Sequence, residues 1–151
     1  MSYRLEGEIG RLLIPAQTSP RRVDRLWQHT CFEAFIAGDG GGYYECNFSP
    51  STEWAVYRFS GYRAGMTAVE SMQSPRVSVH GEADCLTLDA VIELERLPES
   101  PLRMALAAVV EEADGHLSFW ALAHPSGNPD FHHADSFILA LPGDAASGTA
   151  R

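Results

Sequence analysis

The sequence predicts an all-β protein, an antiparallel β-sandwich, and two observations support this prediction. First, apolar residues alternate with other residues at a period of two in most segments, as in strands that bury one face. Second, clusters of glycine, proline, serine and acidic residues separate these segments at 38–42, 49–52, 80–84, 111–116 and 124–130. Strands joined by such short turns are typical of hairpins in a sandwich or a barrel.

The N-terminal half supplies the first expected strands. Residues 3–15 read as a strand that starts almost at the first residue, which suggests a missing N-terminal strand or a true start further upstream. A helical turn is expected within 19–27, where polar residues precede it. Strands then follow at 31–37, with Phe32, Ala34 and Ile36 on one face, and at 43–50, with Tyr44, Cys46 and Phe48 on one face.

The C-terminal half contains the clearest alternation. In residues 85–97 one face carries Leu86, Leu88, Ala90, Ile92 and Leu94, which predicts a half-buried antiparallel strand. Residues 101–110 have the composition of a helix, but their apolar positions also keep strand parity. The turn at 111–116 can join them as a hairpin to the segment that begins at residue 117, so we predict a strand here.

The length and composition of the chain indicate how many domains it forms and in which cellular compartment it is expected. At 151 residues and 45% hydrophobic content, the chain is expected to form one globular domain over residues 1–142, followed by a flexible tail at 143–151. No apolar run is long enough to span a bilayer, which predicts no membrane partner. The N-terminus has no signal-peptide pattern, so we expect a cytoplasmic protein, or a secreted one if an upstream segment is missing.

Charge and residue usage exclude several functions. A net charge of −9 argues against a nucleic-acid partner. All eleven basic residues other than histidine are arginine, which excludes Schiff-base chemistry and a phosphate-loop lysine. Neither GxxxxGK[ST] nor GxGxxG occurs. The cysteines are widely spaced, so we expect reduced, buried thiols rather than a zinc ribbon or a disulfide framework, at Cys31, Cys46 and Cys85.

Two motifs resemble a known family. The first is a Trp, an E-x-F strand and a Tyr-Glu-x-Asn-Phe-Ser-Pro strand and turn, formed by Trp27, Glu33, Phe35, Tyr44, Glu45, Asn47, Phe48, Ser49 and Pro50. The second is the closing "WALAHPSGNPDFHHADSFILAL" of residues 120–141. Together they resemble bacterial DOMON-like proteins related to family 9 carbohydrate-binding modules. The resemblance runs from about residue 3 to residue 142 and implies a jelly-roll-like sandwich.

Relatives in that superfamily bind sugars or haem, and its sugar-binding modules clamp a saccharide between two tryptophans. Apolar pyranose faces stack on indole rings, while the hydroxyl edge requires fixed acceptors and donors. From their positions in this sequence, we predict ligand contacts by Trp54, Tyr57, Arg58, Trp120 and His124, with Glu45 and Asn47 as polar anchors. A core role is the competing interpretation for both Trp54 and Trp120.

Glu33 and Glu45 stand within apolar strands, where an acidic side chain is costly unless it is paired. One interpretation is a structural ion pair with an arginine across the sheet, such as Arg58 or Arg63. The other is a polar cluster that faces a ligand. The sequence leaves both open.

The segment 124–137, "HPSGNPDFHHADSF", offers the remaining chemistry. We predict an ordered loop in which Pro125 and Pro129 stiffen the chain, Gly127 makes the turn and Phe131 closes the end of the sandwich. His124, Asp130 and His132 are weak candidates for a divalent metal.

Haem is a further alternative, with an axial ligand among His29, Met66, His124 and His132. An enzyme is the last alternative, a small-sugar hydrolase or isomerase in which Asp130 and His132 form the acid–base pair. The sequence nevertheless favours a non-catalytic module without a cofactor. Its predicted ligand is a carbohydrate or another sugar-like small molecule.

Overall fold

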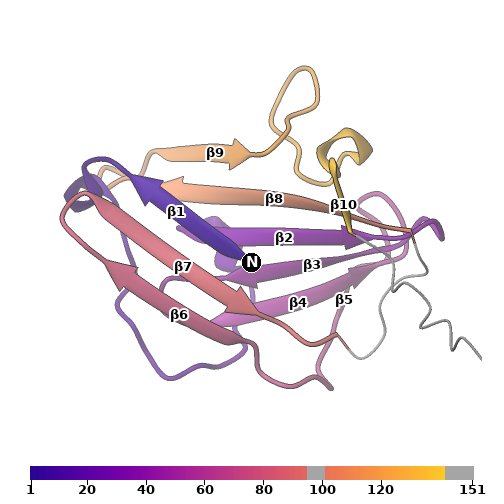
Figure 1. The fold of residues 1–151 in the computed structure, drawn as a ribbon, viewed down its shortest axis with the longest axis horizontal. Coiled ribbons are helices and arrows are strands. Elements are labelled where there is room, and N and C mark those ends of the chain that lie inside the picture. The colour runs from indigo at the N-terminus through magenta and orange to yellow at the C-terminus, as the bar shows by residue number, and fades with distance from the viewer. Residues whose placement is uncertain (95–100, 142–151) are drawn as a thin grey trace, which may run out of the picture.

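The computed structural model describes residues 1–94 and 101–141, and it confirms the all-β antiparallel sandwich (Figure 1). A three-stranded sheet has the order β1-β7-β6, and a seven-stranded sheet has the order β10-β8-β2-β3-β4-β5 with β9 also paired to β8. The strands are β1 (Ser2–Glu6), β2 (Cys31–Ala37), β3 (Tyr43–Phe48), β4 (Trp54–Phe59), β5 (Thr67–Ala68), β6 (Arg76–Gly81), β7 (Cys85–Val91), β8 (Leu102–Glu111), β9 (Leu117–Ala121) and β10 (Leu139–Leu141).

The main core lies between the two sheets, and in Figure 1 the smaller sheet stands in front of the larger one. Every second residue of each strand faces this core, as the alternation in the sequence indicates. The larger sheet contributes Phe32, Ala34, Cys46 and Phe48, and the smaller sheet contributes Leu86, Leu88 and Ala90. The apolar alternation therefore defines which face of each strand meets the other sheet.

A second core covers the opposite face of the seven-stranded sheet, which we call the outer face. The other parity of β2, β3 and β4 supplies its buried residues, including Phe35, Tyr43 and Tyr57. Two connecting segments cover them. One is the 3₁₀ turn η2 (Leu26–Gln28), and the other is the loop after β9, which provides Phe131 and Phe137. Both faces of the central strands are consequently buried, and an acidic residue on the outer face is enclosed.

The strand predictions hold in most segments. Residues 101–110 form β8, and the turn after them leads into β9 as a hairpin. The helical turn expected within 19–27 is η2. The strand predicted over 3–15 is too long, because β1 ends at Glu6 and the chain then turns through Gly7, whose φ is +139°. The strand predicted over 85–97 is also too long, because β7 ends at Val91 and residues 92–94 are not in a strand. Residues 95–97 of that prediction and the predicted tail lie outside the described residues.

The three cysteines are free, and Cys31 and Cys46 are buried as predicted, whereas Cys85 at the start of β7 is only half-buried. Within residues 1–94 and 101–141, no helix has the length and apolar character needed to cross a membrane.

Candidate functional site

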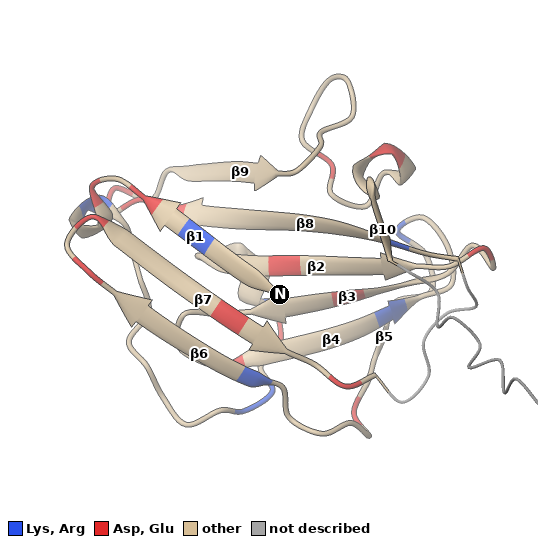
Figure 2. Ribbon diagram, viewed as in Figure 1, with Lys and Arg blue, Asp and Glu red and all other residues tan. Residues whose placement is uncertain are grey.

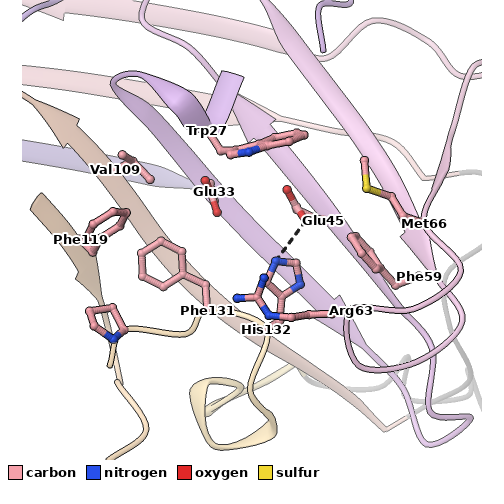
Figure 3. Close-up of a pocket in the computed structure, with 11 residues that line it drawn as sticks. Trp27, Glu33, Glu45, Phe59, Arg63, Met66, Val109, Phe119, Phe131 and His132 are labelled. Carbon is pink, nitrogen blue, oxygen red and sulfur yellow. Dashed lines mark ion pairs between the residues drawn. The ribbon is translucent and has the colours of Figure 1, made fainter. Parts of the chain in front are cut away.

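A pocket of about 380 Å³ opens on the outer face of the larger sheet, and we call it the outer-face pocket (Figure 3). Strands β2, β3, β4, β8 and β9 contribute to it together with η2 and the loops after β4 and β9. Its lining consists of Trp27, Glu33, Glu45, Phe59, Arg63, Met66, Val109, Phe119, Pro129, Phe131 and His132. Segments far apart in sequence thus combine carboxylates, aromatic rings and an imidazole around one cavity.

Two carboxylates from neighbouring strands form the base of the outer-face pocket. Glu33 on β2 and Glu45 on β3 are only 3% and 5% exposed, and Figure 2 shows acidic positions within these two central strands. Asn47 lies directly opposite Glu33 in the antiparallel register, yet its Nδ2 donates to Glu45 Oε1 at 2.8 Å. Glu33 Oε1 is buried and accepts no hydrogen bond from the described residues.

Burial governs the protonation of these carboxylates. Loss of solvation, reinforced by the neighbouring Glu45 charge, raises the pKa of Glu33 well above its usual range, although Arg63 opposes this shift. Burial also raises the pKa of Glu45, against the opposing effects of the Asn47 hydrogen bond and the Arg63 charge. Both pKa shifts favour the protonated carboxyl, which donates one hydrogen bond, whereas the ionised carboxylate only accepts hydrogen bonds and can pair with a cation.

An arginine–aspartate pair borders the pocket. Arg63 Nη2 lies 2.7 Å from Asp130 Oδ1, and the Tyr62 hydroxyl also donates to Asp130. Although burial alone would raise it, the hydrogen bonds from Tyr62 and Arg63 hold the pKa of Asp130 below its usual range. Neither Glu33 nor Glu45 forms an ion pair with an arginine within 1–94 and 101–141, so the predicted structural Glu–Arg contact is wrong.

His132 is fixed between the pocket and the sheet. Its Nδ1 lies 2.7 Å from the Tyr43 hydroxyl, and its Nε2 lies 3.7 Å from Glu45 Oε2, the pair marked by the dashed line in Figure 3. Burial and the nearby Arg63 charge lower the pKa of His132 to about 4. The imidazole is accordingly neutral at pH 7, and it contributes a polar ring rather than a positive charge.

Aromatic rings form the walls of the outer-face pocket. Trp27 on η2 stands above the carboxylates in Figure 3, and the buried ring of Tyr57 supports it edge-on at 5.6 Å. Phe119 and Phe131 lie side by side on another wall, with ring centroids 6.2 Å apart. Because Tyr57 also donates its hydroxyl to Asp24 at 2.9 Å, η2 is held in place before any ligand binds.

The residues predicted as polar anchors lie at this site. Glu45 lines the outer-face pocket, and Asn47 is fully buried behind it, where it positions the Glu45 carboxylate. Tyr57, predicted as a contact, is only 2% exposed and acts from beneath Trp27.

The other predicted contacts lie elsewhere. Trp54 is 5% exposed and packs in the core between the sheets, since it shares the inner-face parity of Val56. Trp120 is 61% exposed but points away from the pocket, because its neighbour Phe119 takes the pocket-facing parity of β9. Arg58 is exposed and borders a different cavity on the inner side, and His124 is exposed beyond the end of β9.

The candidate metal and haem ligands are not gathered into one centre. No group of three or more His, Cys, Asp or Glu side chains suited to a metal occurs within residues 1–94 and 101–141. Asp130 is committed to Arg63 and Tyr62, while His29 pairs with Glu111 at 2.8 Å. Of the four suggested haem ligands, only Met66 and His132 line the outer-face pocket.

The sequence-based list of contacts omitted much of the site. Trp27 belongs to a motif but is not among the predicted contacts. Trp120 is among them, whereas its neighbour Phe119 is not. Phe131 packs on the outer face against Phe35, with ring centroids 6.5 Å apart, rather than at the end of the sandwich. The signal that could have found the pocket is the pair of acidic residues at matching parity in two adjacent apolar strands.

A second cavity of about 450 Å³ adjoins the other side of His132. Glycine backbone of the β2–β3 turn, Tyr43, Arg103 and Phe137 contribute to it. This cavity has no buried, unpartnered polar side chain among its lining residues. The outer-face pocket, with its enclosed carboxylates, is therefore the better candidate site.

No family model, curated protein or solved structure matches this chain.

Proposed function

We propose that this protein is a non-catalytic binding module that holds a sugar-like, polyhydroxylated small molecule in the outer-face pocket. The observation that carries the proposal is the Glu33 carboxyl, which is only 3% exposed, lines the pocket and has an oxygen without a hydrogen-bond partner among the described residues. Leaving a buried acceptor unsatisfied costs about 1–3 kcal/mol, and a ligand hydroxyl would recover this energy.

The walls suit the same class of ligand. Pyranose rings have apolar C–H faces that pack on aromatic rings, and Trp27, Phe119 and Phe131 provide such rings around the carboxylates. The volume of about 380 Å³ fits one or two sugar rings rather than a long chain enclosed along its length. The resemblance of residues 3–142 to DOMON-like proteins, some of which bind sugars, favours the same interpretation.

A binding function is also favoured over acid–base catalysis. The pair predicted for an enzyme was Asp130 and His132, but Arg63 and Tyr62 engage the Asp130 carboxylate. The pKa of His132, at about 4, leaves the imidazole a weak base at neutral pH.

The proposal is tested by calorimetric titration of mono- and oligosaccharides, followed by intrinsic fluorescence of the same mixtures. We expect a saturable heat with at least one monosaccharide and a fluorescence change that is lost in Trp27→Phe. The change should persist in Trp120→Phe, because Trp120 lies outside the pocket. The absence of saturable heat with every sugar would overturn the proposed function.

Neighbouring aromatic residues on β9 provide a matched pair of variants. Phe119→Ala is expected to weaken sugar binding about fivefold, because it removes a stacking ring worth on the order of 1 kcal/mol from the pocket wall. Trp120→Ala should leave the affinity unchanged, since its ring is on the other face of the strand. Equal losses in both variants, measured by calorimetry, would contradict the assignment of the pocket.

A further inference from the structure

We propose that the ligand carries a primary ammonium group, as an amino sugar does, and that this group binds between Glu33 and Glu45 at the base of the outer-face pocket. This inference rests on the proposed function and specifies its ligand class. It starts from the arrangement of charge, because two enclosed carboxylates on adjacent strands are an unusual base for a pocket that would take only neutral hydroxyls.

The charged side chains around the pocket do not balance the two carboxylates, so the pocket can accept one cation. Arg63, the cationic side chain in the lining, is matched by Asp130 at 2.7 Å and is half-exposed on the pocket border. His132 is neutral at pH 7. The ionised forms of Glu33 and Glu45 are consequently left without a full positive partner among the described residues, and burial favours their protonated forms.

An ammonium group would satisfy both carboxylates better than a hydroxyl does. Its three N–H donors exceed the single donor of a hydroxyl, and hydrogen bonds between ionised partners are about twice as strong as neutral ones. Within residues 1–94 and 101–141, Glu33 Oε1 has no hydrogen-bond partner, and the near polar contact of Glu45 Oε2 is His132 Nε2 at 3.7 Å. Both oxygens are therefore available to N–H donors.

The aromatic walls add a second, independent attraction for positive charge. An ammonium near the face of an aromatic ring gains cation–π energy, which increases when the site excludes water. Figure 3 shows Trp27 and Phe59 on either side of the Glu45 carboxylate, with Phe131 beside Glu33. A neutral polyol gains from stacking alone, whereas an amine-bearing sugar gains from stacking and from charge.

Binding of an ammonium group should release a proton. The groups that face Glu33 from the packed elements are Glu45 on β3, Arg63 after β4 and His132 after β9, while Trp27 of η2 is not ionisable. On its own strand, the Cys31 thiol is buried and its pKa lies well above its usual value, so it remains neutral. Glu33 and Glu45 are thus the groups that exchange a proton for the ligand cation.

The experiment compares glucosamine with glucose and N-acetylglucosamine, which retain the ring but lack the charge, by calorimetry at pH 7 and pH 5. We expect glucosamine to bind the wild-type protein about tenfold more tightly than glucose at pH 7. The preference should shrink at pH 5, where the carboxyls keep their protons. Heats measured in two buffers with different ionisation enthalpies should show proton release with glucosamine only.

Glu33→Gln supplies the matched variant, because glutamine has the shape of glutamate without its charge. It should bring the affinities for glucosamine and glucose together and abolish the proton release, because only the charged ligand gains from an ionised carboxylate. If this variant does not fold, the pH dependence and proton release of the wild-type protein decide the matter. Equal affinity for glucose and glucosamine would overturn this inference and leave the proposed function standing, whereas failure of all three sugars to bind would overturn both.

Discussion

Trp54→Ala is expected to lower the free energy of unfolding by about 3–5 kcal/mol, the range for removing a large aromatic side chain from a core. Trp54 is 5% exposed, lies opposite Phe48 in the β3–β4 register, and packs in the cluster between the sheets. Urea unfolding of the purified protein measures the effect.

Two further variants sharpen this test. Trp54→Phe should cost clearly less than Trp54→Ala, because it keeps an aromatic ring and removes an indole N–H that has no hydrogen-bond partner among the described residues. Trp120→Ala should change the stability by less than about 0.5 kcal/mol, as expected of an exposed side chain. A Trp54→Ala protein with near wild-type stability and no ligand binding would instead restore Trp54 as a ligand contact.

The second large effect is a loss of stability in acid that depends on His132. The folded protein has a His132 pKa of about 4, below the value of 6.5 for the unfolded chain. Because the pKa is lower in the folded protein, protonation of His132 opposes folding. The contribution of the neutral imidazole to the free energy of unfolding is therefore complete above pH 6.5 and is lost as the pH falls toward 4. The shift corresponds to roughly 3 kcal/mol between these limits.

The measurement is the free energy of unfolding of the wild type and of His132→Gln at several pH values from 7 to 4. We expect the wild type to lose more stability than His132→Gln over this range, by an amount on the order of 3 kcal/mol. Glu33 and Glu45 have raised pKa values, so their protonation at lower pH favours the folded state and opposes the loss from His132. This contribution is present in both proteins. His116→Gln, in an exposed turn, is the control and should follow the wild type. Parallel pH profiles for wild type and His132→Gln would show that His132 is not buried in its neutral form.

The strands were predictable because alternation reports burial directly. Strand β8 is the informative case, since its alanine-rich composition suits a helix and only the parity of its apolar residues indicated a strand. Both faces of β8 are covered by packed residues of the two cores, so both of its parities are largely apolar and its alternation is weaker than that of β7. The extent of β1 was not predictable in this way, because the turn at Gly7 and the 3₁₀ segment Ile9–Arg11 retain apolar residues.

The residues that line the pocket were harder to predict, because only one face of each strand meets the pocket. Trp54, Tyr57 and Arg58 are close in sequence, but Tyr57 has the opposite parity and faces the outer side of the sheet. On β9 the pairing of Phe119 with Val109 decides that Phe119, not Trp120, reaches the pocket. Such choices require the register between strands, which the alternation within one strand does not contain.

The acidic residues were the part of the site that the sequence did indicate. Glu33 and Glu45 stand in apolar strands, where burial of an acidic side chain costs free energy unless a partner compensates for it. The arginine that seemed available, Arg63, is engaged by Asp130 from a loop almost 70 residues away, a contact that only the fold brings together. That pairing leaves Glu33 and Glu45 without an arginine partner among the described residues.

The central claim is that the ligand binds on the outer face of the larger sheet. It is tested most directly by recording amide chemical shifts of isotope-labelled protein during titration with glucosamine and glucose. We expect the largest changes at Trp27, Glu33, Glu45 and His132, with little change at Arg58 or Trp120. Saturable changes that instead centre on Trp120 and His124, or on the cavity beside Arg58, would contradict the account and place the binding site on another face of the sandwich.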